Sequence, residues 1–343
     1  MAGTTYKCPS CGAYLAFDPE SQLWKCPFCD SAFPEDELHA NDETAETAQQ
    51  PSGAQVVYRC QSCGSEIVTD ETTVATRCYY CHSPVVMQGK MTDEYQPDKV
   101  LPFSISREKA VSTFMDWVKK KKYVPRNFFK EAQVESMDGV YYPHFVADCQ
   151  LDCQLDGEAT DTHVHDEGRF VVTDTRHFDV HTEGKITFRS IMRPALKKAN
   201  RKLSDGIHPF PLENAKPFSG AYLAGFLAER RDIAPEDIQP DVQTEVQEYV
   251  RPLLEEQFSH QSIKASVSSQ MKAFRTDYVL LPTWVLTYPN KENPEDPYYY
   301  AMNGCTGEVC GKLPLDKGRL WRKALLVGGI VFAVCCLIAY FLL

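Results

Sequence analysis

Two groups of four cysteines lie in the first quarter of the chain, and the second group repeats the spacing of the first. In each group a Cys-x2-Cys pair is followed, after 14 residues, by another such pair, and the groups are offset by 52 residues. The first group is Cys8, Cys11, Cys26 and Cys29, and the second is Cys60, Cys63, Cys78 and Cys81. Each pair can place two thiolates on one tight turn, and two such turns complete a tetrahedron around zinc.

We therefore expect two structural zinc ions, one in each cysteine group. Four protein ligands leave no open position for water or substrate, so such a metal would hold the fold and take no part in catalysis. Two alternatives stay open. Four thiolates can also hold iron, and His82, which follows Cys81, could replace that cysteine as a ligand.

The charge distribution bears on what these cysteine groups could bind. The chain of 343 residues has a formal net charge of -11, and residues 1–90 hold five basic against twelve acidic side chains. A protein that binds nucleic acid needs a basic surface that displaces counterions from the phosphate backbone. The sequence therefore disfavours nucleic acid as a partner of the cysteine-rich region.

The remaining cysteines indicate the redox compartment. Disulfide-rich secreted proteins are short and begin with a signal peptide, and neither property is evident in this sequence. A reducing cytosol is the better interpretation, with free thiols that behave as small apolar side chains. These expected free thiols are Cys149, Cys153, Cys305, Cys310, Cys335 and Cys336.

The residues from Ala324 to Leu343 form an uncharged stretch of 20. As a helix it would be about 30 Å long, roughly the thickness of one hydrocarbon core. Residues 311–323 hold five basic side chains against one acidic, and positively charged flanks stay in the cytoplasm. We expect a single-pass tail anchor in the lipid bilayer at 324–343, with the body of the chain in the cytoplasm. The alternative is a buried core helix.

These features divide the chain into five segments. Residues 1–38 and 56–90 are expected to be zinc ribbons, small folds organised by the metal. The polar, acidic segment 39–55 between them predicts a flexible linker, which would let the ribbons move independently. Residues 95–315 are expected to form an α+β domain with an antiparallel sheet, followed by the anchor at 324–343.

Within the α+β domain the apolar pattern alternates between helix and strand. Ser106 is expected to cap a helix, and residues 139–192 alternate apolar and polar side chains as in a strand with one wet face. Residues 193–257 return to a helical pattern, with one helix that begins at Pro235, and residues 264–313 are again expected to be strands. Turns are predicted at Gly157, Gly168 and Gly184, and a helical stripe at Tyr222, Leu223, Phe226 and Leu227.

Several longer motifs accompany the cysteine pairs. They are CPSCG, KCPFC, YQPDKVLPFSIS (Tyr95–Ser106), MDGVYYPHFV (Met137–Val146), LSDGIHPF (Leu203–Phe210), FSGAYLAGFLAERRD (Phe218–Asp232) and YAMNGCTGEVCGKLPLD (Tyr300–Asp316). Together they resemble a family of bacterial membrane-anchored proteins with tandem zinc ribbons. That family is often labelled as transcription-factor-type zinc-ribbon or primosomal helicase-like. The chain departs from the pattern at His144, Cys305 and Cys310.

The helicase label implies a nucleotide-binding loop of the form GxxxxGK[ST], and this sequence has none. The resemblance implies instead a cytosolic scaffold on the bacterial cell membrane, and it names no reaction. We therefore expect a non-enzymatic, membrane-tethered adaptor whose ribbons and α+β domain recruit cytosolic or membrane-associated protein partners. Two alternatives are a nucleic-acid-associated zinc-ribbon protein and a domain that binds a small molecule or lipid at the membrane.

A second kind of metal site is conceivable on the expected strands, where four histidines alternate with carboxylates. Side chains two residues apart on a strand share a face, so several imidazoles could converge if two strands pair. The plainer interpretation is a set of solvent-facing histidines on the wet side of a sheet. These residues are His163, His165, His177 and His181.

Overall fold

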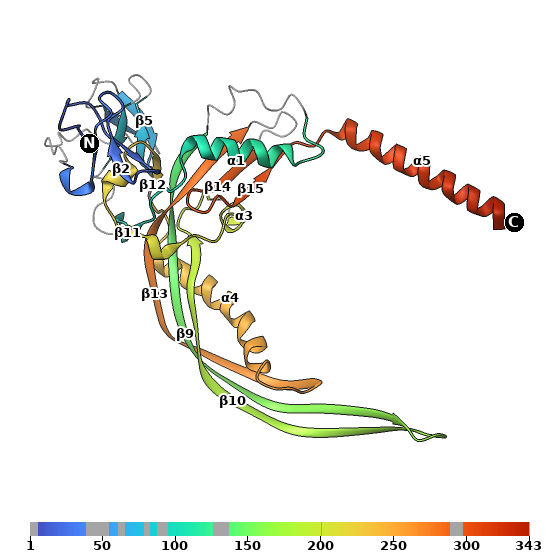
Figure 1. The fold of residues 1–343 in the computed structure, drawn as a ribbon. Coiled ribbons are helices and arrows are strands. Elements are labelled where there is room, and N and C mark those ends of the chain that lie inside the picture. Colours follow the sequence, from blue (N-terminus) through green and yellow to red (C-terminus); the bar gives the residue numbers. More distant parts are fainter. Residues whose placement is uncertain are drawn as a thin grey trace.

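The computed structural model describes residues 6–38, 55–60, 66–78, 83–87, 95–125, 137–199, 201–288 and 298–342. These residues form an α+β protein, as the sequence predicts. A small N-terminal lobe and a body of mixed sheet lie at one end, and a long curved arm extends from the body (Figure 1). A single C-terminal helix, α5 (Lys317–Leu342), projects away from the body.

The N-terminal lobe is a small antiparallel sheet that carries the first cysteine group. Its elements are β1 (Ala16–Asp18), β2 (Leu23–Lys25), β3 (Ala32–Phe33) and the single turn η1 (Glu35–Glu37). The buried side chains of Leu15, Phe17 and Trp24 supply its apolar interior. A lobe of this size buries too little apolar surface to be stable alone, so it needs a metal or a neighbour.

The structure provides such a neighbour, because the lobe packs on the body. The Trp24 indole N–H donates to the Ala221 carbonyl over 2.7 Å, and the Phe17 amide donates to Ala224 over 2.9 Å. The rings of Phe17 and Trp24 also meet Tyr222 at centroid distances of 5.3 and 5.1 Å. The expectation that this ribbon moves independently of the rest is therefore wrong, since its core is continuous with that of the body.

The second cysteine segment is also joined to the body. Its strands are β4 (Gln55–Arg59), β5 (Glu66–Asp70), β6 (Thr73–Arg77) and β7 (Pro84–Val86). β4 and β5 form a separate antiparallel pair, whereas β6 pairs with the body, where Ala75 lies opposite Ala228. The Arg230 guanidinium reinforces this seam through the Glu71 carboxylate at 2.8 Å. The expected linker at 39–55 lies outside the described residues, apart from Gln55.

The central sheet has ten strands, and its main path runs β11-β8-β13-β9-β12-β6-β7. β10 pairs with β9, and β14 pairs with both β13 and β15. The strands not yet given are β8 (Lys99–Val100), β9 (Asp138–Asp166), β10 (Val171–Pro194), β11 (Lys216–Pro217), β12 (Leu227–Glu229), β13 (Ser262–Tyr288), β14 (Tyr298–Asn303) and β15 (Val309–Lys312). The strand pattern at 139–192 and at 264–313 is confirmed.

The arm consists of β10, β9 and β13 in antiparallel register, with helix α4 (Pro235–Glu255) against its inner face (Figure 1). Alternate strand residues, such as Cys149, Leu151 and Cys153, are buried there against Val246 and Val250 of the helix. The other face is polar, so the predicted sheet with one wet face is confirmed. α4 begins at Pro235 as expected.

Only one of the three arm glycines predicted to form turns does so. Gly168 does form the β9–β10 turn with φ +79°, but Gly157 and Gly184 lie inside strands. A Cβ at Gly157 would collide with the backbone of Lys264 and Ala265, which shows that this glycine permits close strand pairing. Uninterrupted pairing across both positions makes β9 29 residues and β10 24 residues long.

Helix α1 (Arg107–Lys119) confirms the predicted cap, since the Ser106 hydroxyl accepts from the Lys109 amide. The predicted helical stripe after residue 217 is wrong. That segment forms the short turn η5 (Gly220–Leu223) and then strand β12, and Phe226 stacks flat on Phe103 at 4.3 Å. The aromatic residues of this segment are spaced as on one face of a helix. Their side chains nevertheless reach the core from an irregular backbone.

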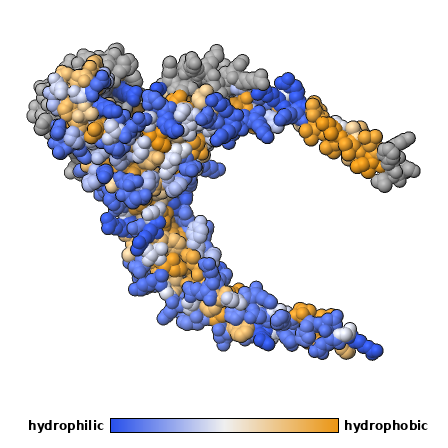
Figure 2. Space-filling view, viewed as in Figure 1, coloured by the Kyte–Doolittle hydropathy of each residue, from blue (hydrophilic) through white to orange (hydrophobic). Residues whose placement is uncertain are grey.

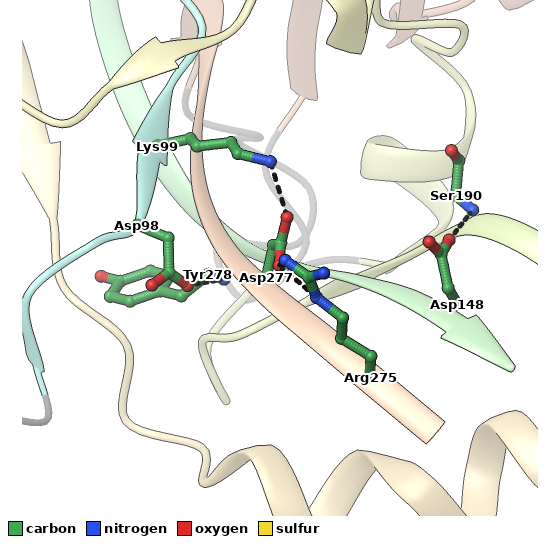
Figure 3. A network of polar contacts seen from close by, with 7 residues as sticks. All are labelled: Asp98, Lys99, Asp148, Ser190, Arg275, Asp277 and Tyr278. Carbon is green, nitrogen blue, oxygen red and sulfur yellow. Dashed lines mark hydrogen bonds and ion pairs between the residues drawn. The ribbon is translucent and has the colours of Figure 1, made fainter. Parts of the chain in front are cut away.

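The arm leaves the body through a polar network shown in Figure 3. Asp277 of β13 accepts from Lys99 of β8 at 2.7 Å and from Arg275 at 3.1 Å. Across the sheet, the Ser190 amide donates to Asp148 at 2.8 Å, at a bulge where Ser190 has φ 57°. These pairs fix strand positions where the sheet starts to bend, so we regard the network as structural.

Helix α5 is both apolar and exposed along its length. The span Lys317–Ala339 is long and apolar enough to cross a membrane, with a mean hydropathy of 2.1, and none of its most apolar stretch is buried. Figure 2 shows a hydrophobic rod beyond a hydrophilic base. The predicted apolar C-terminal helix is confirmed, and its placement in a membrane is taken up below.

Candidate metal centre

The first cysteine group sits on two matching turns. The Gly12 amide donates to the Cys8 carbonyl at 2.9 Å, and the Asp30 amide donates to the Cys26 carbonyl at 3.0 Å. Gly12 and Asp30 follow the second cysteine of their pairs and both have positive φ, +74° and +57°. This left-handed backbone turns each Cys-x2-Cys segment back on itself, and Gly and Asp are among the residues that tolerate it.

The turns bring four sulfur atoms together. The Sγ atoms of Cys8, Cys11, Cys26 and Cys29 all lie within 4.8 Å of one another. Cys8 and Cys29 are 3.6 Å apart, and Cys11 and Cys26 are 3.5 Å apart. A tetrahedron with metal–sulfur bonds of about 2.3 Å has edges of about 3.8 Å. The four thiols are therefore already spaced as ligands of one metal ion.

The chemistry of the donors also fits a metal. Hydrogen bonds from the Ser31 side chain and amide lower the pKa of the Cys29 thiol, whereas hydrogen bonds with the neighbouring cysteines raise the pKa of the Cys11 thiol. The four thiols therefore already interact as one group. Cys8 and Cys26 are buried while Cys11 and Cys29 are exposed. Metal can therefore enter from the solvent side, and the two buried sulfurs join the site to the lobe's interior.

The second cysteine group is described only in part. Cys60 and Cys78 are both buried, and they pack with Ile67 in a small apolar cluster of their own. Cys63 and Cys81, the other two predicted ligands, lie outside the described residues, as does His82. The structure therefore shows one four-cysteine group that could hold a metal ion.

The backbone around Cys78 nevertheless repeats the first lobe. The Cys78 amide donates to the Ser83 carbonyl at 2.9 Å, as the Cys26 amide does to Ser31 at 2.9 Å. The strand pair Arg59↔Glu66 likewise matches the bridge Lys7↔Tyr14. Each match is displaced by the same 52 residues as the cysteines. The sequence repeat is thus a structural repeat wherever both copies are described.

The four arm histidines are not assembled into a site. In the described part of the chain, the cysteine group is the only set of three or more potential ligands with atoms this close together. The histidines are exposed, and His181 is paired with Asp156 at 2.5 Å, which raises its pKa. His163 lies opposite Asp174, and His177 opposite Thr160. The interpretation as solvent-facing side chains is confirmed.

A buried histidine elsewhere was not singled out as functional by the sequence. His144 of β9 is 4% exposed, and its Nε2 lies 2.7 Å from the Ser204 hydroxyl on α3 (Arg201–Asp205). Its Nδ1 lies 3.2 Å from the Tyr142 carbonyl. Burial lowers the pKa of His144 to about 4, so the ring is neutral. Its Nδ1–H donates to the Tyr142 carbonyl, and its Nε2 accepts a hydrogen bond from the Ser204 hydroxyl. The 60 residues between the partners left no local signal for this contact.

His144 and Ser204 line a cavity of about 510 Å³. Its walls combine aromatic and aliphatic side chains, including Tyr142, Ile207 and Tyr299. At its edge the Lys198 ammonium pairs with the Glu229 carboxylate at 3.0 Å. An apolar cavity with a few polar groups is a common form of small-molecule site.

The buried imidazole predicts a pH-dependent stability. Because the pKa of His144 falls from 6.5 to about 4 on folding, the unfolded state binds the extra proton between these values. The free energy of unfolding is therefore unaffected by this group above pH 6.5. It falls as the pH drops from 6.5 towards 4, by about 3 kcal/mol at most. Urea unfolding from pH 7.5 to 4.5 should show a shallower loss for His144→Gln than for the wild type. An equal pH dependence of the unfolding free energy in the two proteins would contradict this assignment. Loss of metal in acid would affect both proteins alike, so it drops out of the difference between them.

Comparison with known proteins adds a relative but no activity. No family model matches the chain, and no solved structure matches it. The chain is 30% identical over 342 residues to the uncharacterized protein YdjG of Bacillus subtilis (strain 168), and the match covers 96% of both chains. The chain therefore belongs to the same family as YdjG.

Proposed function

We propose that the protein is a zinc-stabilised, membrane-tethered adaptor without enzymatic activity. Zinc is proposed because four thiolates at tetrahedral spacing match its usual structural sites. A second zinc ion is proposed at Cys60, Cys63, Cys78 and Cys81, on the strength of the repeat in sequence and backbone. Both ions would be structural, since four cysteines complete the coordination.

The tether is proposed to be α5, inserted in a bacterial cell membrane with the body in the cytoplasm. The helix is exposed along its apolar length, and a monomeric soluble protein rarely leaves so large an apolar surface in water. Basic side chains gather at its start, at Lys317, Arg319, Arg322 and Lys323. Such flanks favour the cytoplasmic side.

One observation supports the adaptor role above the others, namely the exposure of Phe28 at the tip of the Cys26–Cys29 turn. Its side chain is 69% exposed, although Tyr14 stacks edge-on against it at 5.5 Å. The opposite side of the lobe is fixed to the body through Trp24 and Tyr222. A rigidly held, exposed aromatic ring is typical of the side chains that contribute most to protein–protein binding.

We therefore expect Phe28→Ala to weaken recruitment of protein partners about tenfold or more while the metal content stays unchanged. The measurement is quantitative mass spectrometry of proteins that co-purify with the full chain from native membranes. The matched control is Phe170→Ala, which removes an equally exposed ring, 72% exposed, from the arm tip. Loss with Phe170→Ala but not with Phe28→Ala would move the docking surface to the arm. Tyr79 and Tyr80, which lie between Cys78 and Cys81 and are candidate contacts by the same argument, lie outside the described residues.

The cavity beside His144 favours a second candidate, the binding of a small molecule by the body. Ser204→Trp would fill this cavity from α3, where Ser204 is partly buried beside His144. A compound that raises the unfolding temperature of the wild type but not of Ser204→Trp would establish this function. A role with nucleic acid is less well supported, because the cysteine-rich region is acidic.

A further inference from the structure

The start of α5 and the end of α1 lie together although about 195 residues separate them. The Asp316 amide donates to the Tyr123 carbonyl at 2.7 Å, and the Arg319 guanidinium reaches the Val124 carbonyl at 3.5 Å. The Lys323 ammonium lies 5.5 Å from the centre of the Tyr123 ring. Figure 1 shows the C-terminal end of α1 next to the base of α5. The lysine run after α1 is thereby placed beside the helix proposed to enter the membrane.

This contact joins two basic segments into one surface, which we call the basic collar. The collar consists of Lys119, Lys120, Lys121, Lys122, Lys317, Arg319, Arg322 and Lys323. All of these side chains are exposed except Arg319, which is half-buried. Lys119 pairs with the Asp116 carboxylate, and Arg319 pairs with the Asp316 carboxylate. The collar thus gathers eight cations on a chain whose net charge is -11.

We propose that the basic collar binds the anionic headgroups of phospholipids where the chain enters the bilayer. The proposal rests on the proposed insertion of α5 and adds a specific lipid preference to it. Lysine and arginine clusters next to a membrane helix attract acidic lipids over a distance of about one Debye length. Lys119 and the three lysines that follow α1 lie next to the membrane helix only because the contacts of Tyr123 and Val124 with the start of α5 hold them there.

The surrounding side chains favour a lipid surface over a soluble polyanion. Trp321, 68% exposed, and Leu320, 41% exposed, lie among the collar cations, and Leu325 continues the apolar surface one turn later. Tryptophan and basic residues side by side are typical of the interface between headgroups and hydrocarbon. The predominantly acidic remainder of the chain would be repelled by an anionic surface. The collar would therefore set which side of the body faces the membrane.

The test measures lipid binding to the full chain in a neutral detergent by native mass spectrometry. Phosphatidylglycerol and phosphatidylcholine are titrated separately, and the ratio of their affinities is compared between proteins. In the test variant Lys119, Lys120, Lys121 and Lys122 are changed to Gln, which keeps side-chain length and removes four charges. The matched control changes Lys185, Lys202, Lys264 and Lys272 to Gln, four exposed lysines of the arm and body. Circular dichroism confirms that both variants fold.

We expect the wild type and the control to prefer phosphatidylglycerol, and the test variant to lose about tenfold or more of that preference. An unchanged preference in the test variant would overturn the proposal, because the cations of α5 alone would then account for the binding of anionic lipid. No preference in the wild type would overturn it as well. A separate carbonate extraction of wild-type membranes reports on the anchor itself, so a failure of the proposed insertion is distinguished from a failure of the collar.

Discussion

Cys26→Ser should remove one metal ion per chain and unfold the first ribbon. Cys26 is 1% exposed, and its sulfur lies 3.5 Å from that of Cys11 on the opposite turn. Structural zinc in such sites contributes on the order of 10 kcal/mol of apparent folding free energy. The lobe has little apolar interior to replace that contribution. Elemental analysis of the purified protein should fall from two zinc ions per chain to one.

The packing of the lobe makes a further consequence measurable. Trp24 is 1% exposed and donates its indole N–H to Ala221, so unfolding of the ribbon exposes both Trp24 and the ring of Tyr222. Tryptophan fluorescence should therefore shift to longer wavelength in Cys26→Ser. The control is Cys310→Ser, a free thiol of β15 that should change neither readout. Loss of both ions together, or of none, would contradict two separate structural sites, and a coloured preparation would indicate iron.

Deletion of residues 324–343 should move the protein from the membrane fraction to the soluble fraction. The deleted segment carries no charge, and the span of α5 that contains it is not buried against the rest of the chain. Removing it therefore leaves the cores of the lobe, body and arm intact. The full chain should resist carbonate extraction, whereas the truncated chain should stay in the supernatant with an unchanged unfolding temperature.

A matched control separates membrane insertion from adhesion by the basic collar. Replacing residues 324–343 with an unrelated 20-residue helix of Leu and Ala should restore carbonate resistance, because only length and hydropathy are required. A truncated chain that still pellets in about 1 M salt would show that α5 is not the anchor, since salt screens the attraction of Lys317 and its neighbours to lipid. A reporter fused at Met1 should be cytoplasmic.

The contacts of both cysteine-rich segments with the body limit the use of truncations as tests of partner binding. Removal of residues 1–90 would delete β6 and β7 from the central sheet and uncover Ala228 of β12. It would also remove Trp24 from its contact with Ala221. Such a truncation would disturb the body, which is why single substitutions such as Phe28→Ala are the sharper test of partner binding.

The sequence alone determined the features that depend on local spacing. The Cys-x2-Cys pairs predicted tight turns, which Gly12 and Asp30 complete in the structure, because two ligands three residues apart require a reversal of the backbone. The uncharged run at 324–343 predicted an exposed apolar helix, and the pattern after Pro235 predicted α4. Each of these signals is contained within a few turns of chain, and no distant partner changes it.

The tertiary structure decided everything that depends on contacts between distant segments. The docking of Trp24 on Ala221, the pair His144 and Ser204, and the collar around Tyr123 join residues 60 or more positions apart. Composition and periodicity carry no information on such pairs. The segment around Phe226 was misread for the same reason, since its aromatic spacing reflects packing against Phe103 rather than a helix. Local spacing fixes backbone turns and helices, whereas packing free energy, which is shared among distant side chains, fixes the rest.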